Sequence, residues 1–306
     1  MNKKISFDLS NHEFKMAQYN SDSDLDKVYA PLSVILQVTR RCNLKCNFCS
    51  ESQYFADPHI DDLLHLIPLL SGVQRVYLSG GEPLLRNDIF DIIDEFGKRF
   101  PVLGLPTNTT IITKEVCNKL YGKISYINAG LDGPRDINNL VRGGYDDIIK
   151  GLYILRDNGI EVSLSTVILK YTLPFLQHVV QIADVLGITK VKMVVPVLRG
   201  RAAALTEDDF ASNKDILNKF HEISHLKETV GLRPRVKVTF WNSDTEGYAL
   251  IIYPDFNVYA WPVFDQPDAV LHIGSLKEES IEAIWARYPY KYNHIKKYTG
   301  LTMYKA

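Results

Sequence analysis

Three cysteines lie within eight residues of each other in this 306-residue chain, at Cys42, Cys46 and Cys49. Their spacing is C-x3-C-x2-C, and they follow an apolar run at residues 34–38. Thiolates are soft ligands that select zinc, copper(I) or iron–sulfur clusters, so three of them this close can surround one metal centre. A four-iron cluster is usually held by four cysteines, and three would leave one iron open to another ligand.

Two other interpretations of the cysteines remain open at this point. Positions 42, 46 and 49 are spaced i, i+4 and i+7, so on a helix they would form a buried stripe without a metal. The intervening Asn43, Lys45 and Asn47 argue against a helix interior, because asparagine favours turns. A zinc site is the second alternative, and it would need a distant fourth ligand such as His59 or His65.

The overall composition is that of an ordinary soluble globular protein, with 46% hydrophobic and 23% charged residues. A net charge of -1 gives no sign of a nucleic-acid-binding surface. No apolar run approaches the roughly 18–20 residues of a membrane span, and the N-terminus lacks the apolar stretch of a signal peptide. Three bunched cysteines do not make a disulfide framework. We therefore expect a cytoplasmic protein without nucleic-acid or membrane partners.

Strand and helix patterns alternate along the middle of the chain. This alternation predicts parallel βαβ units that wind right-handedly into a sheet or an open barrel. Parallel barrels carry their chemistry at the carboxyl ends of the strands, and the cysteines follow the first strand. The expected strands are 33–39, 73–79, 101–107, 124–130, 160–168 and 189–197, and the expected helices are near 59–70, 88–99, 113–121, 144–158 and 173–186.

The sequence pattern changes after residue 206 to a helix followed by short strands. We therefore expect an N-terminal extension at 1–31, a core at 32–205 and a smaller β-rich domain with a tail at 206–306. The elements expected in this last part are helices near 207–224 and 278–288 and strands at 235–241, 247–253 and 257–261.

A second motif, Gly80-Gly81-Glu82-Pro83, ends the second expected strand. Two glycines let a backbone approach a ligand closely, and the carboxylate of Glu82 could bind an ammonium group. Gly-Gly is also common in tight turns, so the motif alone is weak. Its position matters more, because it should open at the same end of the sheet as the cysteines.

Together the two motifs resemble those of the radical S-adenosylmethionine (radical SAM) enzymes, over about residues 32–205. The segments 130–134, 142–143, 158–160 and 196–201 are similar to the branch that contains the molybdopterin-precursor and SPASM/twitch enzymes. The resemblance implies an α/β fold, a partial (β/α)6 TIM-like barrel with a small β-rich twitch-like C-terminal domain. It also implies a low-potential electron donor such as flavodoxin or ferredoxin.

The resemblance implies a role for each matching residue. One [4Fe–4S] cluster would be held by Cys42, Cys46 and Cys49. Its fourth iron, which has no cysteine ligand, would bind the amino and carboxylate groups of S-adenosylmethionine. The methionine ammonium would be received by Gly80, Gly81 and Glu82. The remaining contacts to S-adenosylmethionine would come from Phe48, Asp132, Arg142, Ser165 and Val195. The 5′-deoxyadenosyl radical formed from this cofactor would abstract a substrate hydrogen.

The chain departs from the family pattern at several positions. Gly130 stands where relatives often have serine, so one cofactor contact is missing or comes from Asn108 or Asn128. Trp261 stands where a cysteine would precede Pro262, and no cysteine follows residue 117. This sequence therefore offers no cysteines for an auxiliary cluster. Because two-electron oxidations commonly use such a cluster, we expect redox-neutral chemistry.

Two groups of residues have a functional and a structural interpretation. Cys117 could donate a hydrogen atom to a substrate radical, although a buried helix cysteine is the simpler interpretation. An aromatic group could line a substrate pocket or belong to the core. This group consists of Trp241, Tyr248, Tyr259, Trp261 and Phe264.

The sequence leaves the substrate open. We expect a small molecule of specialised-metabolite or cofactor biosynthesis, such as a sugar or nucleoside derivative, because no leader-binding domain is evident. The alternative is a maturase or epimerase of a ribosomally made peptide. The alternative of another class is a non-catalytic iron–sulfur or zinc protein.

Overall fold

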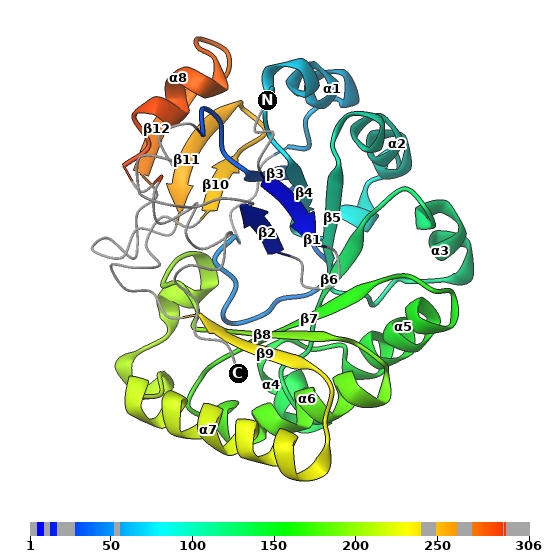
Figure 1. Cartoon of the computed structure of the whole chain (residues 1–306), viewed down its shortest axis with the longest axis vertical. Helices are drawn as coiled ribbons and strands as arrows, with labels where there is room; N and C mark the ends of the chain where they lie inside the picture. Colours follow the sequence, from blue (N-terminus) through cyan, green and yellow to red (C-terminus); the bar gives the residue numbers. More distant parts are fainter. Residues whose placement is uncertain are drawn as a thin grey trace.

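The computed structural model describes residues 5–8, 13–16, 28–51, 56–239, 249–261, 271–289 and 291. Its centre is a ten-stranded sheet with the order β12-β11-β10-β3-β4-β5-β6-β7-β8-β9. Figure 1 shows the strands curving around an interior, with the helices on the outside. The α/β fold, a partial TIM-like barrel with a β-rich C-terminal region, is confirmed.

Eight consecutive strands of the sheet are parallel, and seven of these follow one another along the chain, one more than the six expected. The seventh, β9, was expected in the C-terminal part, but it pairs with β8 and extends the barrel. The seven strands are β3 (Ser33–Thr39), β4 (Arg75–Gly80), β5 (Val102–Thr107), β6 (Tyr126–Gly130), β7 (Val162–Val167), β8 (Lys190–Val194) and β9 (Arg235–Thr239).

Helices connect these strands on the outer face, and one short helix had not been expected, α4. The α-helices are α1 (Ile60–Leu69), α2 (Ile89–Arg99), α3 (Lys114–Leu120), α4 (Arg135–Val141), α5 (Tyr145–Asp157), α6 (Leu176–Val185) and α7 (Asn213–Val230). The short 3-10 turns are Pro83–Leu85, Leu173–Phe175, Gly200–Ala204 and Glu207–Asp209. No helix in the described part of the chain is long and apolar enough to cross a membrane.

The C-terminal part adds strands to both edges of the barrel sheet. At the edge opposite β9, β10 (Ala249–Ile252) pairs in parallel with β3. Two antiparallel strands follow, β11 (Asn257–Trp261) and β12 (Leu271–Ser275), and α8 (Ile281–Ala286) packs against β12. The strands β9 and β10 belong to the same sheet as the core. The separate domain expected at 206–306 therefore stays a prediction.

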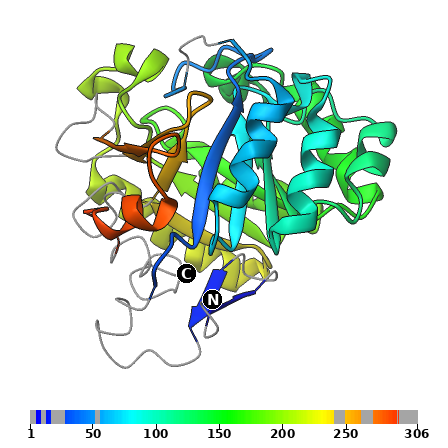
Figure 2. The same ribbon diagram turned by 90° about the horizontal axis from the view of Figure 1, so that it is seen from above.

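The described part of the N-terminal extension contains a hairpin, which is not among the strands expected from the sequence. Its strands are β1 (Ile5–Asp8) and β2 (Glu13–Met16). Figure 2 shows the hairpin beneath the barrel, at the end opposite the loop that follows β3. The Phe14 side chain is buried, and the Arg75 guanidinium lies 5.0 Å from the centre of its ring. The hairpin therefore covers the amino-terminal end of the barrel.

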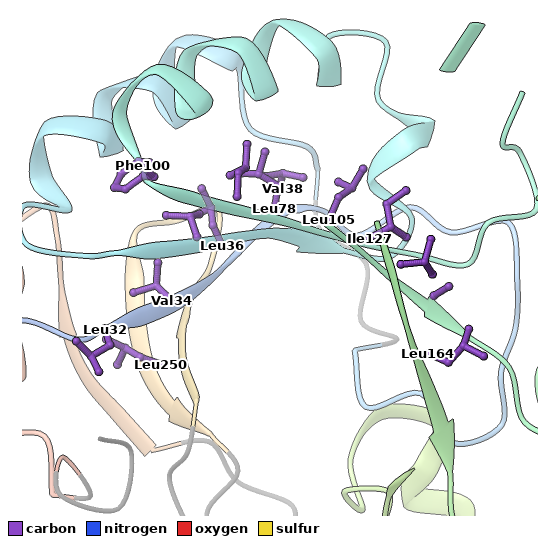
Figure 3. Close-up of a cluster of buried hydrophobic side chains, with 14 of the residues drawn as sticks. Leu32, Val34, Leu36, Val38, Leu78, Phe100, Leu105, Ile127, Leu164 and Leu250 are labelled. Carbon is purple, nitrogen blue, oxygen red and sulfur yellow. The ribbon is translucent and has the colours of Figure 1, made fainter. Parts of the chain in front are cut away.

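The hydrophobic core lies between the strands and the outer helices. On the parallel strands β3 to β9 every second residue is buried and, apart from Thr166 on β7, apolar, as Figure 3 shows for Leu36, Leu78, Leu105 and Leu164. These residues face outwards to the helices, so the residues between them face the barrel interior. This alternation decides which side chains can reach a molecule inside the barrel.

Candidate active site

The cysteine loop, residues 40–51, leaves the carboxyl end of β3 and contains no helix, so the helical-stripe alternative is wrong. Arg40 and Glu51 form an ion pair that joins the two ends of the loop. The Tyr253 hydroxyl donates to Glu51 at 3.1 Å, and Arg199 donates to the Tyr253 oxygen at 3.0 Å. The segments after β10 and β8 thus hold the base of the loop.

Backbone groups inside the cysteine loop are tied to two other segments. The Arg201 backbone N–H donates to the Cys49 carbonyl at 2.9 Å, and its Nε donates to the Cys46 carbonyl at 2.8 Å. The Asn47 N–H donates to the Val141 carbonyl at 2.9 Å. These bonds fix the shape of the loop through its peptide groups, so the sulfur atoms are not needed for that purpose.

The three thiols of the loop differ in exposure. Cys46 is buried, Cys49 is half-buried and Cys42 is exposed. The Leu44 N–H lies 3.4 Å and the Asn108 amide nitrogen 3.9 Å from the Cys42 sulfur. Burial raises the pKa of the Cys42 and Cys46 thiols. Metal binding requires the deprotonated form, and N–H groups directed at sulfur favour it.

The type and number of metal-binding side chains indicate which metal centre the loop can hold. Among the described side chains, no three of the types His, Cys, Asp and Glu are arranged around a single ion. A tetrahedral zinc ion would draw its sulfur ligands to within about 4 Å of one another. Three thiolates that bind three different irons lie further apart. The donor set of three cysteine thiols on one loop is compatible with a cluster in which each cysteine binds a different iron.

The glycine turn, residues 80–82, lies against the cysteine loop. The Gly81 N–H donates to the Thr39 carbonyl at 2.9 Å, and the Glu82 N–H donates to the Arg41 carbonyl at 2.7 Å. A Cβ atom on Gly80 would overlap the Thr39 carbonyl oxygen, and one on Gly81 would overlap that of Arg41. The glycines therefore permit a close approach of two backbones, and an approach to a ligand stays a prediction.

The Glu82 side chain is fully buried rather than open at the turn. Its carboxylate accepts hydrogen bonds from the Thr107 hydroxyl (2.8 Å), the Asn108 N–H (2.7 Å) and the Leu84 N–H (3.1 Å). Burial raises the pKa of Glu82 to about 7, although these donors act in the opposite direction. Glu82 thus fixes the glycine turn to the carboxyl end of β5, and its contact to an ammonium group stays a prediction.

Asn108 connects the two motifs. Its N–H bonds the Glu82 carboxylate, while its side-chain amide donates to Asn43 of the cysteine loop at 2.7 Å. The next residue, Thr109, is buried and has φ +62°, which is rare for a β-branched residue. Such strain persists only where the surroundings impose it. Here it turns the chain so that Asn108 faces both motifs.

Glu82→Gln tests this anchoring role. We expect the free energy of unfolding to fall by about 1–3 kcal/mol, because the new amide must face one of three N–H or O–H donors. The folded-state pKa is raised from 4.5 to about 7, so the proton on Glu82 stabilises the fold at low pH. This stability is lost as the pH rises through 7. The cost of the substitution should therefore be larger at pH 5 than at pH 8 in urea unfolding.

Glu95→Gln on the solvent-facing side of α2, where Glu95 pairs only with Lys98, is the control for this measurement, and it should change the unfolding free energy little at either pH. An equal effect of both substitutions would contradict the anchoring role of Glu82.

Asp132 and Arg142 form a buried ion pair beside the cysteine loop. Arg142 Nε donates to Asp132 at 2.7 Å, and Asp132 also accepts the Val167 N–H at 2.8 Å. The guanidinium lies 5.0 Å from the ring centre of Phe48. Burial alone would lower the pKa of Arg142, but the charges of Asp132 and Cys46 raise it above its usual value. Arg142 therefore carries a permanent positive charge next to the thiols.

The same arginine explains the glycine at position 130. A Cβ atom on Gly130 would overlap the Arg142 guanidinium. A serine at this position would require the Arg142 guanidinium to shift. The departure from the family pattern thus makes room for the arginine.

The remaining predicted residues lie at the same end of the barrel on neighbouring strands. Ser165 on β7 faces the interior and is level with Gly130 on β6. Val195 directly follows β8 and packs partly against the core. All eleven predicted site residues thus lie at or near the carboxyl ends of the parallel strands, and their roles stay predictions.

Cys117 and the aromatic group are not among the residues placed at the cysteine loop and the glycine turn. Cys117 on α3 is 1% exposed within the core between helices and sheet, which favours the structural interpretation. Tyr259 stacks edge-on against Tyr253, with ring centres 5.2 Å apart. Trp241, Tyr248 and Phe264, and the side chain of Trp261, lie outside the described residues.

Several residues that shape the site had no signal of their own in the sequence. Glu51, Tyr253 and Asn43 are ordinary polar residues until the fold brings them to the cysteine loop. Arg86 is another, since its buried guanidinium donates to the Val38 carbonyl at 2.7 Å. Arg199 and Arg201, in contrast, stand in the segment 196–201 that the family resemblance singled out.

Comparisons with known proteins connect the chain to one superfamily. Residues 36–182 match the family model described as Radical SAM superfamily. The AdoMet-dependent heme synthase of Nitratidesulfovibrio vulgaris is 26% identical over 212 residues, which cover 63% of this chain and 58% of that protein. The Fe-coproporphyrin III synthase of Methanosarcina barkeri is 27% identical over 188 residues, which cover 58% of this chain and 47% of that protein.

The chain thus spans about half to three-fifths of the length of these two curated relatives. Among solved structures, Streptococcus suis SuiB bound to precursor peptide SuiA has a TM-score of 0.73 and 14% identity. That likeness covers 90% of this chain and 69% of SuiB, and at this identity it shows the fold alone.

Proposed function

We propose that the chain is a radical SAM enzyme that cleaves S-adenosylmethionine reductively and abstracts a hydrogen atom from its substrate, as the match of residues 36–182 to the family model suggests. Members of this family use a [4Fe–4S] cluster together with S-adenosylmethionine. The observation that carries the proposal is the hydrogen bonding between the cysteine loop and the glycine turn, with Asn108 between them. A structural metal site would have no need for such a turn.

In this proposal Cys42, Cys46 and Cys49 hold the cluster, and it is the only one that cysteines of this sequence can hold. With the cluster and S-adenosylmethionine both bound, one electron from the reduced cluster would break the sulfonium carbon–sulfur bond and so supply methionine and a 5′-deoxyadenosyl radical. The chain's own residues position the cofactor and exclude water around it.

The burial of Glu82 and Asp132 refines the expected contacts. The carboxylates of both residues bond protein donors, so the ammonium group of methionine would meet backbone carbonyls of the glycine turn. Glu82 then acts by holding that turn. Arg142 is the partly exposed member of its ion pair, and it would bond the methionine carboxylate. Phe48, Ser165 and Val195 would flank the nucleoside.

For the substrate we propose a small molecule that undergoes redox-neutral chemistry, as the missing auxiliary cysteines suggest. The names of the two curated relatives, a heme synthase and an Fe-coproporphyrin III synthase, favour a small molecule. A peptide substrate is the alternative, since SuiB was solved with a precursor peptide. Flavodoxin or ferredoxin would supply the electron, and the C-terminal strands would form the twitch-like part. The cytoplasm stays the expected compartment.

Anaerobic reconstitution with iron and sulfide, followed by dithionite and S-adenosylmethionine, tests the proposal. We expect 5′-deoxyadenosine and methionine in equal amounts, and no release from a Cys46→Ala variant. Deuterium transfer from a labelled candidate into 5′-deoxyadenosine would then identify the substrate. A cluster-loaded protein that releases no 5′-deoxyadenosine would contradict catalysis, and zinc in place of iron would contradict the cluster.

A further inference from the structure

A buried amide beside the glycine turn has an oxygen atom without a hydrogen-bond donor. Gln37 on β3 is 2% exposed, and its Oε1 atom accepts no hydrogen bond from the residues that the structure describes. Its neighbours Leu36 and Val38 are fully buried against the outer helices, so Gln37 faces the barrel interior. A buried carbonyl oxygen without a donor destabilises a fold, so its presence in a native protein needs an explanation.

The polar residues on either side of Gln37 along the interior face of β3 are hydrogen-bonded. Arg75 Nε donates to the Ser33 hydroxyl at 3.0 Å, and the Thr39 hydroxyl donates to Asp57 at 2.6 Å. Both hydroxyls belong to buried residues, as the Gln37 amide does. The protein thus supplies partners to the two polar side chains that flank Gln37 but no donor to the amide oxygen between them. This contrast points to a donor on a bound molecule.

The register of the sheet places Gln37 next to the glycine turn. Gln37 is level with Ser79 on β4, and the residue after Ser79 is Gly80, the first of the turn. The methionine part of S-adenosylmethionine is proposed to bind at this turn, whereas its nucleoside is proposed to lie against strands further along the sheet. Glu82 is fully buried and already accepts three hydrogen bonds from protein groups, so its carboxylate is not available to the methionine part.

We propose that the Gln37 amide oxygen accepts a hydrogen bond from the amino group of bound S-adenosylmethionine, beside the backbone carbonyls of the glycine turn. This assignment rests on the proposed function and adds a cofactor-binding residue that lies outside both motifs. The terminal torsion of a glutamine side chain is soft, and the Gln37 oxygen has no bond that a rotation would break. The amide can therefore turn towards the ligand, and the new bond would fix the orientation of the methionine part.

Unfolding in urea, without S-adenosylmethionine, is the first test of this role. Gln37→Met keeps the length of the side chain and removes the unsatisfied oxygen, so we expect a urea midpoint at or above that of wild type. Gln181→Met, on the exposed surface of α6, is the matched control and should leave the midpoint unchanged. A lower midpoint for Gln37→Met would show that the amide holds the fold, and it would overturn the proposal.

Anaerobic equilibrium dialysis of the reconstituted protein is the second test, with two probes. S-adenosylmethionine carries the amino group, and 5′-methylthioadenosine lacks the whole amino-acid part. We expect Gln37→Met to weaken S-adenosylmethionine binding roughly tenfold and to leave 5′-methylthioadenosine binding unchanged. Gln37→Glu keeps an oxygen acceptor, so it should bind S-adenosylmethionine like wild type. Gln181→Met should bind both probes like wild type.

A Gln37→Met variant that binds S-adenosylmethionine like wild type would overturn the proposal, and so would equal weakening for both probes. Equal losses in Gln37→Met and Gln37→Glu would also overturn it, and this comparison decides if 5′-methylthioadenosine binds too weakly to measure. Iron content should be unchanged in every variant. Iron-loaded wild-type protein that does not bind S-adenosylmethionine would count against the radical SAM function instead. Gln37→Leu serves if Gln37→Met does not fold, with the same expected results.

Discussion

Cys46→Ala is expected to abolish the iron–sulfur cluster of the anaerobically reconstituted protein, whereas Cys117→Ala is expected to leave it intact. Cys46 is the buried thiol of the cysteine loop, and Arg201 Nε donates a hydrogen bond to its backbone carbonyl. With two thiolates left, a four-iron cluster would have two unprotected irons. Cys117 is also buried, but it lies in the apolar core on α3.

Iron and sulfide analysis with the visible absorption spectrum measures this difference. Iron should fall from about four per chain to a small fraction in Cys46→Ala. Cys117→Ala removes one buried sulfur atom, so it controls for loss of a thiol and for a modest loss of stability. Equal iron content in wild type and Cys46→Ala would show that the loop does not hold the cluster.

Gly81→Ala is expected to weaken S-adenosylmethionine binding at least tenfold and to lower the free energy of unfolding by about 1–3 kcal/mol. The added methyl group would overlap the Arg41 carbonyl oxygen, which belongs to the backbone and has no side-chain freedom to move away. The turn would separate from the cysteine loop. Because Gly81 does not have a positive φ, the effect is one of space rather than of backbone conformation.

Gly97→Ala on α2 is the matched control for this substitution. Its φ is also not positive, and an added methyl group would meet the Lys123 carbonyl oxygen at 3.2 Å. Alanine favours a helix over glycine by roughly 0.5–1 kcal/mol, which offsets that tight contact. Equilibrium dialysis with S-adenosylmethionine and urea unfolding measure both variants. If Gly81→Ala matched Gly97→Ala in both, the turn would have no role in binding.

The features that were predictable from the sequence are local ones. Each barrel strand is a short segment with apolar residues at alternate or successive positions between turn residues, and the two motifs lie where two of these segments end. Six parallel strands and their common carboxyl end therefore followed from the residues themselves. The cluster and S-adenosylmethionine followed from the resemblance that these motifs carry.

The features that were not predictable depend on contacts between distant segments. The sequences of the short strands β9 and β10 do not indicate which edge of the sheet each strand joins, because strand pairing depends on the whole sheet. Glu82 illustrates the same limit at the site. Its motif suggested an open carboxylate, but donors from residues 107 and 108 draw the side chain inwards.

The pairing of β10 with β3 also sets an order of events during synthesis on the ribosome. β3 emerges early, while its partner at Ile251 and Ile252 emerges more than two hundred residues later. Until then β3 has an open edge, which can template pairing with other chains. Tyr253, which holds Glu51 at the base of the cysteine loop, arrives with that same late strand. We therefore expect the nascent loop to be loosely held, and so open to iron delivery, until the last third of the chain has docked.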